Sequence, residues 1–156
     1  MAYSGKFVRQ DGIYGGIHIH DGSTAQEIDT GTTYEKITLF TDNSYAENVT
    51  PDVANDKITI TIPGRYRVAG QMSFSSGTAN VVWWGAAFWN GVEQDQVHFK
   101  RKTSTSNDVG SASLNGFVDV TSVPTDVDFR VRHDNGAGIN FTLEYGNINV
   151  EYVGET

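Results

Sequence analysis

Residues 56–75, "DKITITIPGRYRVAGQMSFS", decide the fold, because two alternating segments meet there at Pro63-Gly64. In each segment an apolar side chain falls at every second position, which is typical of a β-strand with one buried face. The apolar positions are Ile58, Ile60 and Ile62 before the turn, and Tyr66, Val68, Met72 and Phe74 after it. We therefore predict two amphipathic strands.

The Pro63-Gly64 joint shows how these strands are related. Pro at the second position and Gly at the third suit a type II turn. The twist of that turn opposes the twist of paired strands, so it makes a poor two-residue hairpin. Both apolar faces can still be buried if the turn carries the chain from one sheet to a facing sheet. Pro63-Gly64 is thus predicted to be a corner between two sheets.

Further short strands are predicted on both sides of this corner. "YEKITLF" precedes it, and "NVVWWGAAFW" runs into Asn90-Gly91, the strongest short hairpin signal. Alternation returns in "SASLNGFVDV", "VDFRVRH" and "INFTLEYGNINVEYV". Roughly eight to ten short strands without a helical stripe are typical of an all-β sandwich or jelly roll.

Residues 1–30 differ from the remainder of the chain. They are glycine-rich and weakly patterned, as in "GIYGGIHIHDGS". We predict an N-terminal arm over residues 1–30, or a first irregular strand, and a jelly-roll domain over residues 31–156.

Composition limits the function classes. A chain of 156 residues is the usual size of one domain, and the absence of cysteine excludes a disulfide scaffold and a cysteine-based zinc site. The net charge of −8 disfavours nucleic acid and anionic lipid as partners. There is no signal-peptide pattern and no apolar run long enough to span a membrane, so we expect the chain to be made in a cytoplasm.

Aromatic residues gather in "VVWWGAAFWNG". Because neighbouring strand residues face opposite sides, Trp83 and Trp84 cannot both enter one core. Three interpretations stay open: a central strand buried on both faces, a subunit interface, and a platform that stacks on sugars. Several exposed aromatics on a monomer would favour aggregation, so we expect an oligomer. The residues predicted for the subunit interface or the core are Trp83, Trp84, Phe88, Trp89, Tyr66 and Phe74.

The "HIHD" segment is a candidate metal site. His18 and His20 share one face of an extended chain. In a trimer, two imidazoles from each chain would supply six nitrogens, enough for octahedral iron or nickel, in an arrangement that resembles the His-x-His metal sites of phage fibres. The alternative is a polar strand face with surface histidines. No other cofactor is expected.

Enzymatic activity is not predicted. "GIYGGIHIH" resembles the opening Gly-x5-His-x-His of cupins, but Thr24 and Ala25 stand where the cupin glutamate should be, and no second cupin motif follows. Cysteine and a Gly-x-Ser-x-Gly elbow are absent, and the four histidines have no Ser or Asp partner by spacing.

Residues 37–75 resemble the signature region of the complement globular-head and tumour necrosis factor superfamily. The matching positions are Ile58, Ile60, Pro63, Gly64, Tyr66, Val68 and Phe74. The closing "FTLEYGNINVEYV" is similar to the last strands of that family, although it lacks the usual Phe-Ser-Gly-Phe ending. The resemblance spans residues 33–153 and implies a roughly ten-stranded jelly roll that assembles as a homotrimer.

A small, acidic, cysteine-free trimeric jelly roll with an arm resembles a bacteriophage virion component. We expect a capsid decoration (cement) protein or head fibre that binds the major capsid protein through residues 1–30. Loops 103–110 and 134–138 would face solvent. The alternative is the receptor-binding or glycan-binding head of a phage tail fibre or bacterial surface protein, with a host-surface glycan as partner. If Trp84 or Trp89 faces solvent, the glycan-binding head is favoured. If both lie at a subunit interface, the capsid decoration protein is favoured.

Overall fold

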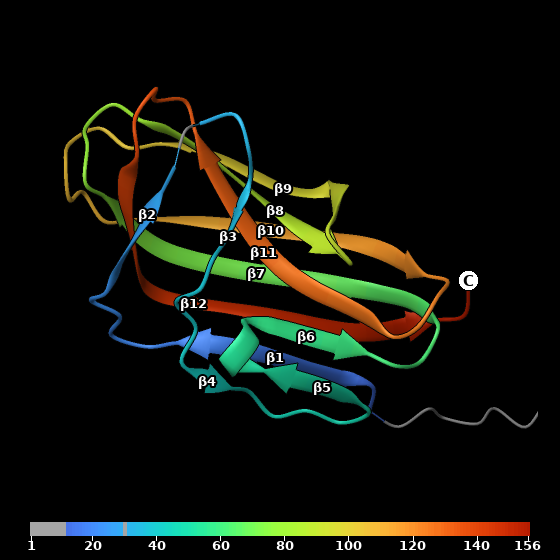
Figure 1. Cartoon of the computed structure of the whole chain (residues 1–156). Coiled ribbons are helices and arrows are strands. Elements are labelled where there is room, and N and C mark those ends of the chain that lie inside the picture. Colours follow the sequence, from blue (N-terminus) through green and yellow to red (C-terminus); the bar gives the residue numbers. More distant parts are fainter. Residues whose placement is uncertain (1–11, 30) are drawn as a thin grey trace, which may run out of the picture.

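The computed structural model describes residues 12–29 and 31–156, which form two facing antiparallel β-sheets (Figure 1). Sheet A has the order β10-β7-β12-β1-β4, with β2 also paired to β12. Its strands are β1 (Tyr14–Ile19), β2 (Ala25–Ile28), β4 (Asp42–Asn43), β7 (Gly64–Ser76), β10 (Gly110–Val120) and β12 (Ile139–Gly154). Sheet B has the order β5-β6-β11-β8-β9, with β3 also paired to β11. Its strands are β3 (Glu35–Lys36), β5 (Val49–Asp52), β6 (Lys57–Ile60), β8 (Val82–Trp89), β9 (Val92–Lys102) and β11 (Thr125–His133).

One short 3₁₀ turn, η1 (Val53–Asn55), joins β5 to β6. Within the described ranges, no helix has the length and apolar character that crossing a membrane requires. The prediction of an all-β sandwich is confirmed.

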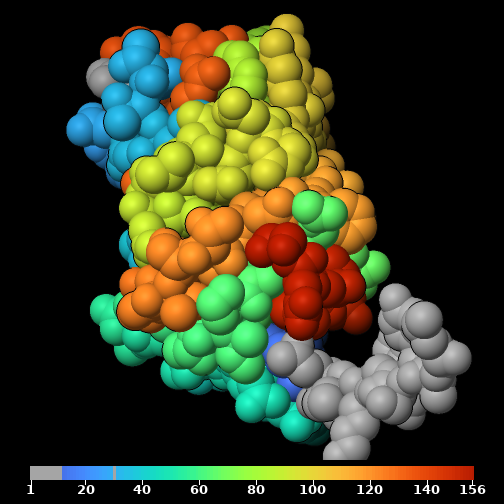
Figure 2. All heavy atoms as spheres, turned by 90° about the vertical axis from the view of Figure 1, so that its right-hand side faces the viewer, coloured from blue at the N-terminus to red at the C-terminus, as the bar shows by residue number. Residues whose placement is uncertain are grey.

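The Pro63-Gly64 corner lies where the sequence predicts it. β6 belongs to sheet B and β7 to sheet A, so the chain changes sheets between Ile60 and Gly64. Gly64 has φ +149°, and a Cβ there would stand 2.2 Å from the ring of Tyr152. Only glycine tolerates both this backbone angle and this approach. Figure 2 views the end of the sandwich where the corner, in green, meets the last residues of β12, in red.

The Asn90-Gly91 hairpin is also confirmed. The dipeptide joins β8 to β9, and both residues have positive φ, +46° and +80°. Those angles match a type I′ turn, whose twist suits paired strands.

The core lies between the sheets and is rich in aromatic rings. Tyr66, Phe74 and Trp83 are fully buried, and the Phe141 ring lies 4.8 Å from that of Phe74 and 5.2 Å from that of Trp83, between centroids. Burying each large side chain contributes about 2–3 kcal/mol. The alternating residues singled out in the sequence point inward as expected, with Ile58, Ile60, Val68 and Met72 buried.

Part of the segment predicted as an arm or a first irregular strand forms two strands of sheet A. β1 pairs with β12 along its whole length, from Tyr14 opposite Glu151 to Ile19 opposite Gly146, so residues 14–28 belong to sheet A. The weak sequence pattern has a packing cause: a Cβ on Gly15 would lie 2.4 Å from Val49, and the Gly16 position is equally crowded by β12. Close approach of the backbone requires these glycines. The rest of the predicted arm, residues 1–11, lies outside the described residues.

The strand registers give the sandwich two distinct ends. The first described residue, Gly12, is at the same end as the Pro63-Gly64 corner and the last residues of β12, which we call the proximal end. Loops 103–109 and 134–138 lie at the opposite, distal end, where β10 and β12 begin. Most residues of both loops are exposed.

Candidate functional site

The outer face of sheet A is the candidate site. We define it as the side chains of β1, β7, β10 and β12 that point away from the core, together with Ser44 and Tyr45 beside β4. Alternation along each strand fixes which residues these are. Most carry amide or hydroxyl groups, and they lie in cross-strand rows: Gln71 opposite both Asn147 and Ser113, and Ser73 opposite Ser111 with 3.2 Å between hydroxyl oxygens.

Exposed aromatic side chains mark this face. Tyr14 is 42% exposed, Tyr45 94%, Phe117 57% and Tyr145 45%. Within residues 12–29 and 31–156, these are all the aromatic side chains classed as exposed. Tyr14 and Tyr45 line one hollow of the face, and Phe117 lies at its β10 edge. Exposed aromatics gathered on one surface indicate an interaction site.

Charges on the outer face of sheet A compensate each other. Arg65 donates two hydrogen bonds to Asp119, at 2.6 and 2.9 Å, and Arg67 lies 2.7 Å from Glu151. The Arg65 guanidinium lowers the pKa of the Asp119 carboxyl, so the pair stays ionised at neutral pH. A chain of net charge −8 therefore presents strands on which acids and arginines are matched. Copies of the chain could meet here with little mutual repulsion.

A hollow of about 520 Å³ opens on this face. Its lining mixes imidazole, amide, hydroxyl and phenol groups, from β1, β7, β10 and β12 and from His20 and Ser44. The residues are His18, Ile19, His20, Ser44, Gln71, Met72, Ser73, Ser111, Tyr145, Gly146, Asn147 and Asn149. The donors and acceptors of this lining suit contact with another polar surface.

The two predicted metal ligands, His18 and His20, both lie in that hollow. His18 Nδ1 is 3.1 Å from the Ser44 hydroxyl. His20 Nδ1 is 3.1 Å from the carboxylate of Asp21, and its ring lies edge-on to Tyr145 at 5.1 Å. Each imidazole thus has one nitrogen engaged within the chain. Metal binding by His18 and His20 stays a prediction.

The predicted aromatic cluster divides between core and surface. Tyr66, Phe74 and Trp83 are fully buried and Trp89 is 7% exposed, so these four lie in the core. Among the described residues, the buried indole nitrogens of Trp83 and Trp89 have no hydrogen-bond partner, so packing of the rings has to offset the cost of the two unpaired donors.

Trp84 points outward from sheet B, as the alternation predicts, but its own chain covers it. Lys100 stacks on the ring at 5.0 Å and Arg132 at 4.3 Å. Phe88 lies on the same side, 6% exposed beneath Arg130 at 4.3 Å. Cation–π stacking of this kind stabilises exposed rings by about 0.5–1 kcal/mol each. The tryptophans are therefore accommodated within one chain, and they give no argument for an oligomer.

Tyr34 continues this stack over sheet B. Its ring lies 5.4 Å from Phe88 and beneath Arg132 at 5.2 Å. Burial raises the pKa of the Tyr34 phenol, so the hydroxyl stays protonated near neutral pH. The outer face of sheet B is thus closed by its own basic side chains, in contrast to the outer face of sheet A.

His133 has a structural role. It is fully buried, its Nε2 lies 3.0 Å from the carbonyl oxygen of Ile28, and its Nδ1 accepts a hydrogen bond from the Asn135 backbone at 3.2 Å. Both ring nitrogens are therefore held by the main chain, and neither is free to take a proton from a substrate.

Sequence reasoning missed exposed aromatic residues on the strands of the candidate face. Phe117, Tyr145 and Tyr14 were not singled out, because each stands alone among polar neighbours. For Phe117 and Tyr14 the sequence carried a signal, because each stands at a position of its strand where the alternation predicts a polar, outward-facing residue. Tyr145 has the same spacing as the buried Ile139, Phe141 and Leu143, and the irregularity between Leu143 and Tyr145 turns it outward.

Comparisons with known proteins show the fold. No protein-family model matches the chain, and no curated protein sequence matches it. The globular domain of zebrafish complement 1qA protein superposes with a TM-score of 0.63 at 12% identity, covering 94% of this chain and 100% of that one. Eiger TNF from S. frugiperda gives 0.53 at 13% identity, covering 92% and 95%. The PRD1 vertex protein P5 gives 0.49 at 14% identity, covering 90% and 96%, a score too low to support a conclusion. The jelly roll of the tumour necrosis factor and complement globular-head type, predicted from the sequence, is confirmed.

Proposed function

We propose that this jelly roll is a structural protein of a bacteriophage virion, a capsid decoration protein or head fibre, and that it acts as a homotrimer joined through the outer face of sheet A. The virion assignment is supported by the resemblance stated from the sequence and by the acidic, cysteine-free composition. The homotrimer is supported by the exposed aromatic residues on the outer face of sheet A.

The distribution of exposed aromatics carries the proposal. All four exposed aromatic side chains of the described residues lie on or beside the outer face of sheet A, whereas Trp84 and Phe88 on sheet B are covered by basic side chains. Leaving those four rings in water forgoes stabilisation that a second subunit could supply. The matched Arg65–Asp119 and Arg67–Glu151 pairs remove the electrostatic penalty for bringing acidic chains together.

Capsid binding is assigned to the proximal end. Because residues 12–29 belong to the sandwich, the segment proposed to contact the major capsid protein is shortened to residues 1–11, which lie outside the described residues. Three linked segments would raise one another's effective concentration, so that weak single contacts give slow release from the capsid. The distal loops 103–109 and 134–138 would then face outward.

A glycan-binding head finds less support. That alternative expects Trp84 or Trp89 to be open to solvent as a stacking platform. Trp89 is in the core, and a sugar stacking on Trp84 would have to compete with Lys100 and Arg132, which both stack on that ring.

Two measurements test the proposal. Light scattering of the full chain should give three times the mass of one chain, and a stable monomer would refute the homotrimer. Sedimentation with capsids of the phage that encodes the chain should show binding by the full chain and little by a variant lacking residues 1–11. A truncated trimer that binds capsids as well as the full chain would contradict the assignment of the capsid contact.

A further inference from the structure

An irregularity in β9 places three potential metal ligands side by side. In the β8–β9 ladder, Ala86 lies opposite His98 and Phe88 lies opposite Glu93, with a register shift between them. Ala87 alone therefore spans the four β9 residues from Gln94 to Val97. In a regular strand, residues 93 and 98 would point to opposite faces, because they are an odd number of positions apart. The bulge cancels that difference.

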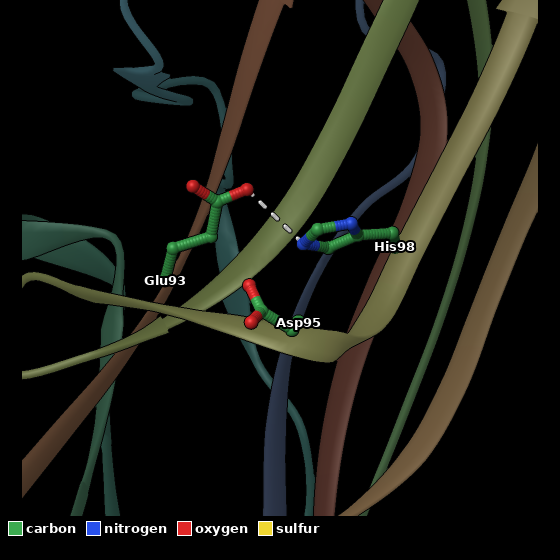
Figure 3. A group of neighbouring side chains, drawn as sticks. All are labelled: Glu93, Asp95 and His98. Carbon is green, nitrogen blue, oxygen red and sulfur yellow. Dashed lines mark ion pairs between the residues drawn. The ribbon is translucent and has the colours of Figure 1, made fainter.

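The side chains of Glu93, Asp95 and His98 converge over this bulge (Figure 3). One donor atom from each residue, a carboxylate oxygen or an imidazole nitrogen, lies within 4.8 Å of the other two. His98 Nε2 is 3.1 Å from a Glu93 oxygen. Ligands about 2.0–2.2 Å from one ion stand roughly 3–4 Å apart, so small rotations of exposed side chains would complete the approach.

The charge of the cluster is not neutralised by any Lys or Arg of the described residues. Four other acids, Asp119, Asp126, Asp128 and Glu151, each have a Lys or Arg within 2.8 Å. Glu93 has only His98 as an ion-pair partner, and Asp95 has none in the part of the chain described. A bound cation would supply the missing positive charge.

We propose that Glu93, Asp95 and His98 form a binding site for a divalent first-row transition ion such as Zn²⁺. One imidazole and two carboxylates give a mixed nitrogen and oxygen set, which suits zinc or its neighbours. Calcium prefers six to eight oxygen ligands, more than these residues offer. The Glu93 and His98 side chains are 37% and 36% exposed, so water can occupy the remaining coordination positions. The ion would join the two ends of the bulged segment of β9 and so stabilise its conformation.

Calorimetric titration of the full chain with ZnCl₂, after treatment with a chelator, tests the site. We expect one ion per chain, at least tenfold weaker binding in the His98→Gln variant and in the Glu93→Gln/Asp95→Asn variant, and weaker binding of Ca²⁺ than of Zn²⁺. All three side chains reach solvent, so the variants should keep the melting temperature of the metal-free chain, which circular dichroism would verify.

The matched control is His18→Asn/His20→Asn, which removes the other candidate ligands and the other ion pair between a histidine and a carboxylate, His20–Asp21. This control should still bind one Zn²⁺ per chain. The proposal is overturned if the wild type binds no zinc, if Ca²⁺ binds more tightly than Zn²⁺, or if zinc is lost in the control while the β9 variants retain it. The result does not depend on the oligomeric state, so it stands or falls separately from the homotrimer.

Discussion

Replacing Phe117 with aspartate should dissociate the proposed homotrimer without unfolding the chain. Phe117 is 57% exposed on β10, at the edge of the outer face of sheet A, so the single chain gains little from it. A buried phenylalanine covers roughly 200 Å². The exposed part therefore amounts to roughly 110 Å² of apolar surface that a neighbouring subunit could bury, worth about 3 kcal/mol at about 25 cal/mol per Å².

That energy corresponds to about a hundredfold weaker association at each subunit contact. The new carboxylate adds to the effect, because an interface would have to bury it without a partner. Sedimentation velocity over a range of concentrations would show the Phe117→Asp chain as a monomer where the wild type is a trimer. Its thermal midpoint as an isolated subunit should be close to that of the monomeric wild type.

Val92→Asp is the matched control. Val92 is 64% exposed, but it lies beside the Asn90-Gly91 hairpin of sheet B. This variant should remain a trimer. The reasoning fails if Phe117→Asp keeps the association constant of the wild type, or if both variants dissociate equally.

Three further predictions concern stability. Gly70→Ala should lower the free energy of unfolding by about 1–3 kcal/mol in urea titrations, because the new Cβ would stand 2.3 Å from the Phe129 ring; an unchanged midpoint would contradict the packing. Burial acts to raise the pKa of Asp126, but hydrogen bonds from Lys57 and Thr59 outweigh burial and lower that pKa. The ionised carboxylate therefore stabilises the fold, so Asp126→Asn should lower the free energy of unfolding at neutral pH, and this difference should disappear as the pH falls below about 4. An equal difference at pH 3 and at pH 7 would refute this. Burial raises the pKa of Tyr66 to about 12, and its hydroxyl donates to the Ile62 carbonyl at 2.8 Å. Tyr66→Phe should therefore cost about 1 kcal/mol and remove a phenol that ionises near pH 12 from an ultraviolet titration; an unchanged titration in that range would contradict the assignment.

The parts of the fold that could be predicted from the sequence are those set by neighbouring residues. Pro63-Gly64 correctly marks the sheet-to-sheet corner, although Gly64 has φ +149° and not the angle of about +80° that a type II turn has at this position. Asn90-Gly91 determines a hairpin through its own backbone angles. The strands within residues 12–29 could not be told from an arm by sequence, because Gly15 and Gly16 leave no side-chain pattern to recognise. These two glycines are required because Val49 and β12 pack closely against their backbone, and this packing exists only in the folded chain.

The candidate sites could be predicted less well, because each depends on strand register. The alternation of strand residues correctly placed Trp83 and Trp84 on opposite faces of sheet B. It could not show that Lys100 and Arg132 stack on the outward-facing ring of Trp84. The β9 bulge could not be predicted either, because it depends on the register between β8 and β9. Glu93 and His98 come together only because the ladder with β8 slips between Ala86 and Phe88.

The opposed ends of the sandwich have a practical consequence. Loop 103–109 links β9 to β10 at the distal end, and its residues from Ser104 to Asn107 are exposed. A foreign epitope spliced between Ser104 and Asn107 would be carried away from the end where Gly12 enters the sandwich, with its two attachment points fixed by neighbouring β-strands. In the proposed homotrimer, such an insertion would present three copies of a cargo on one side, at the end of the sandwich opposite Gly12.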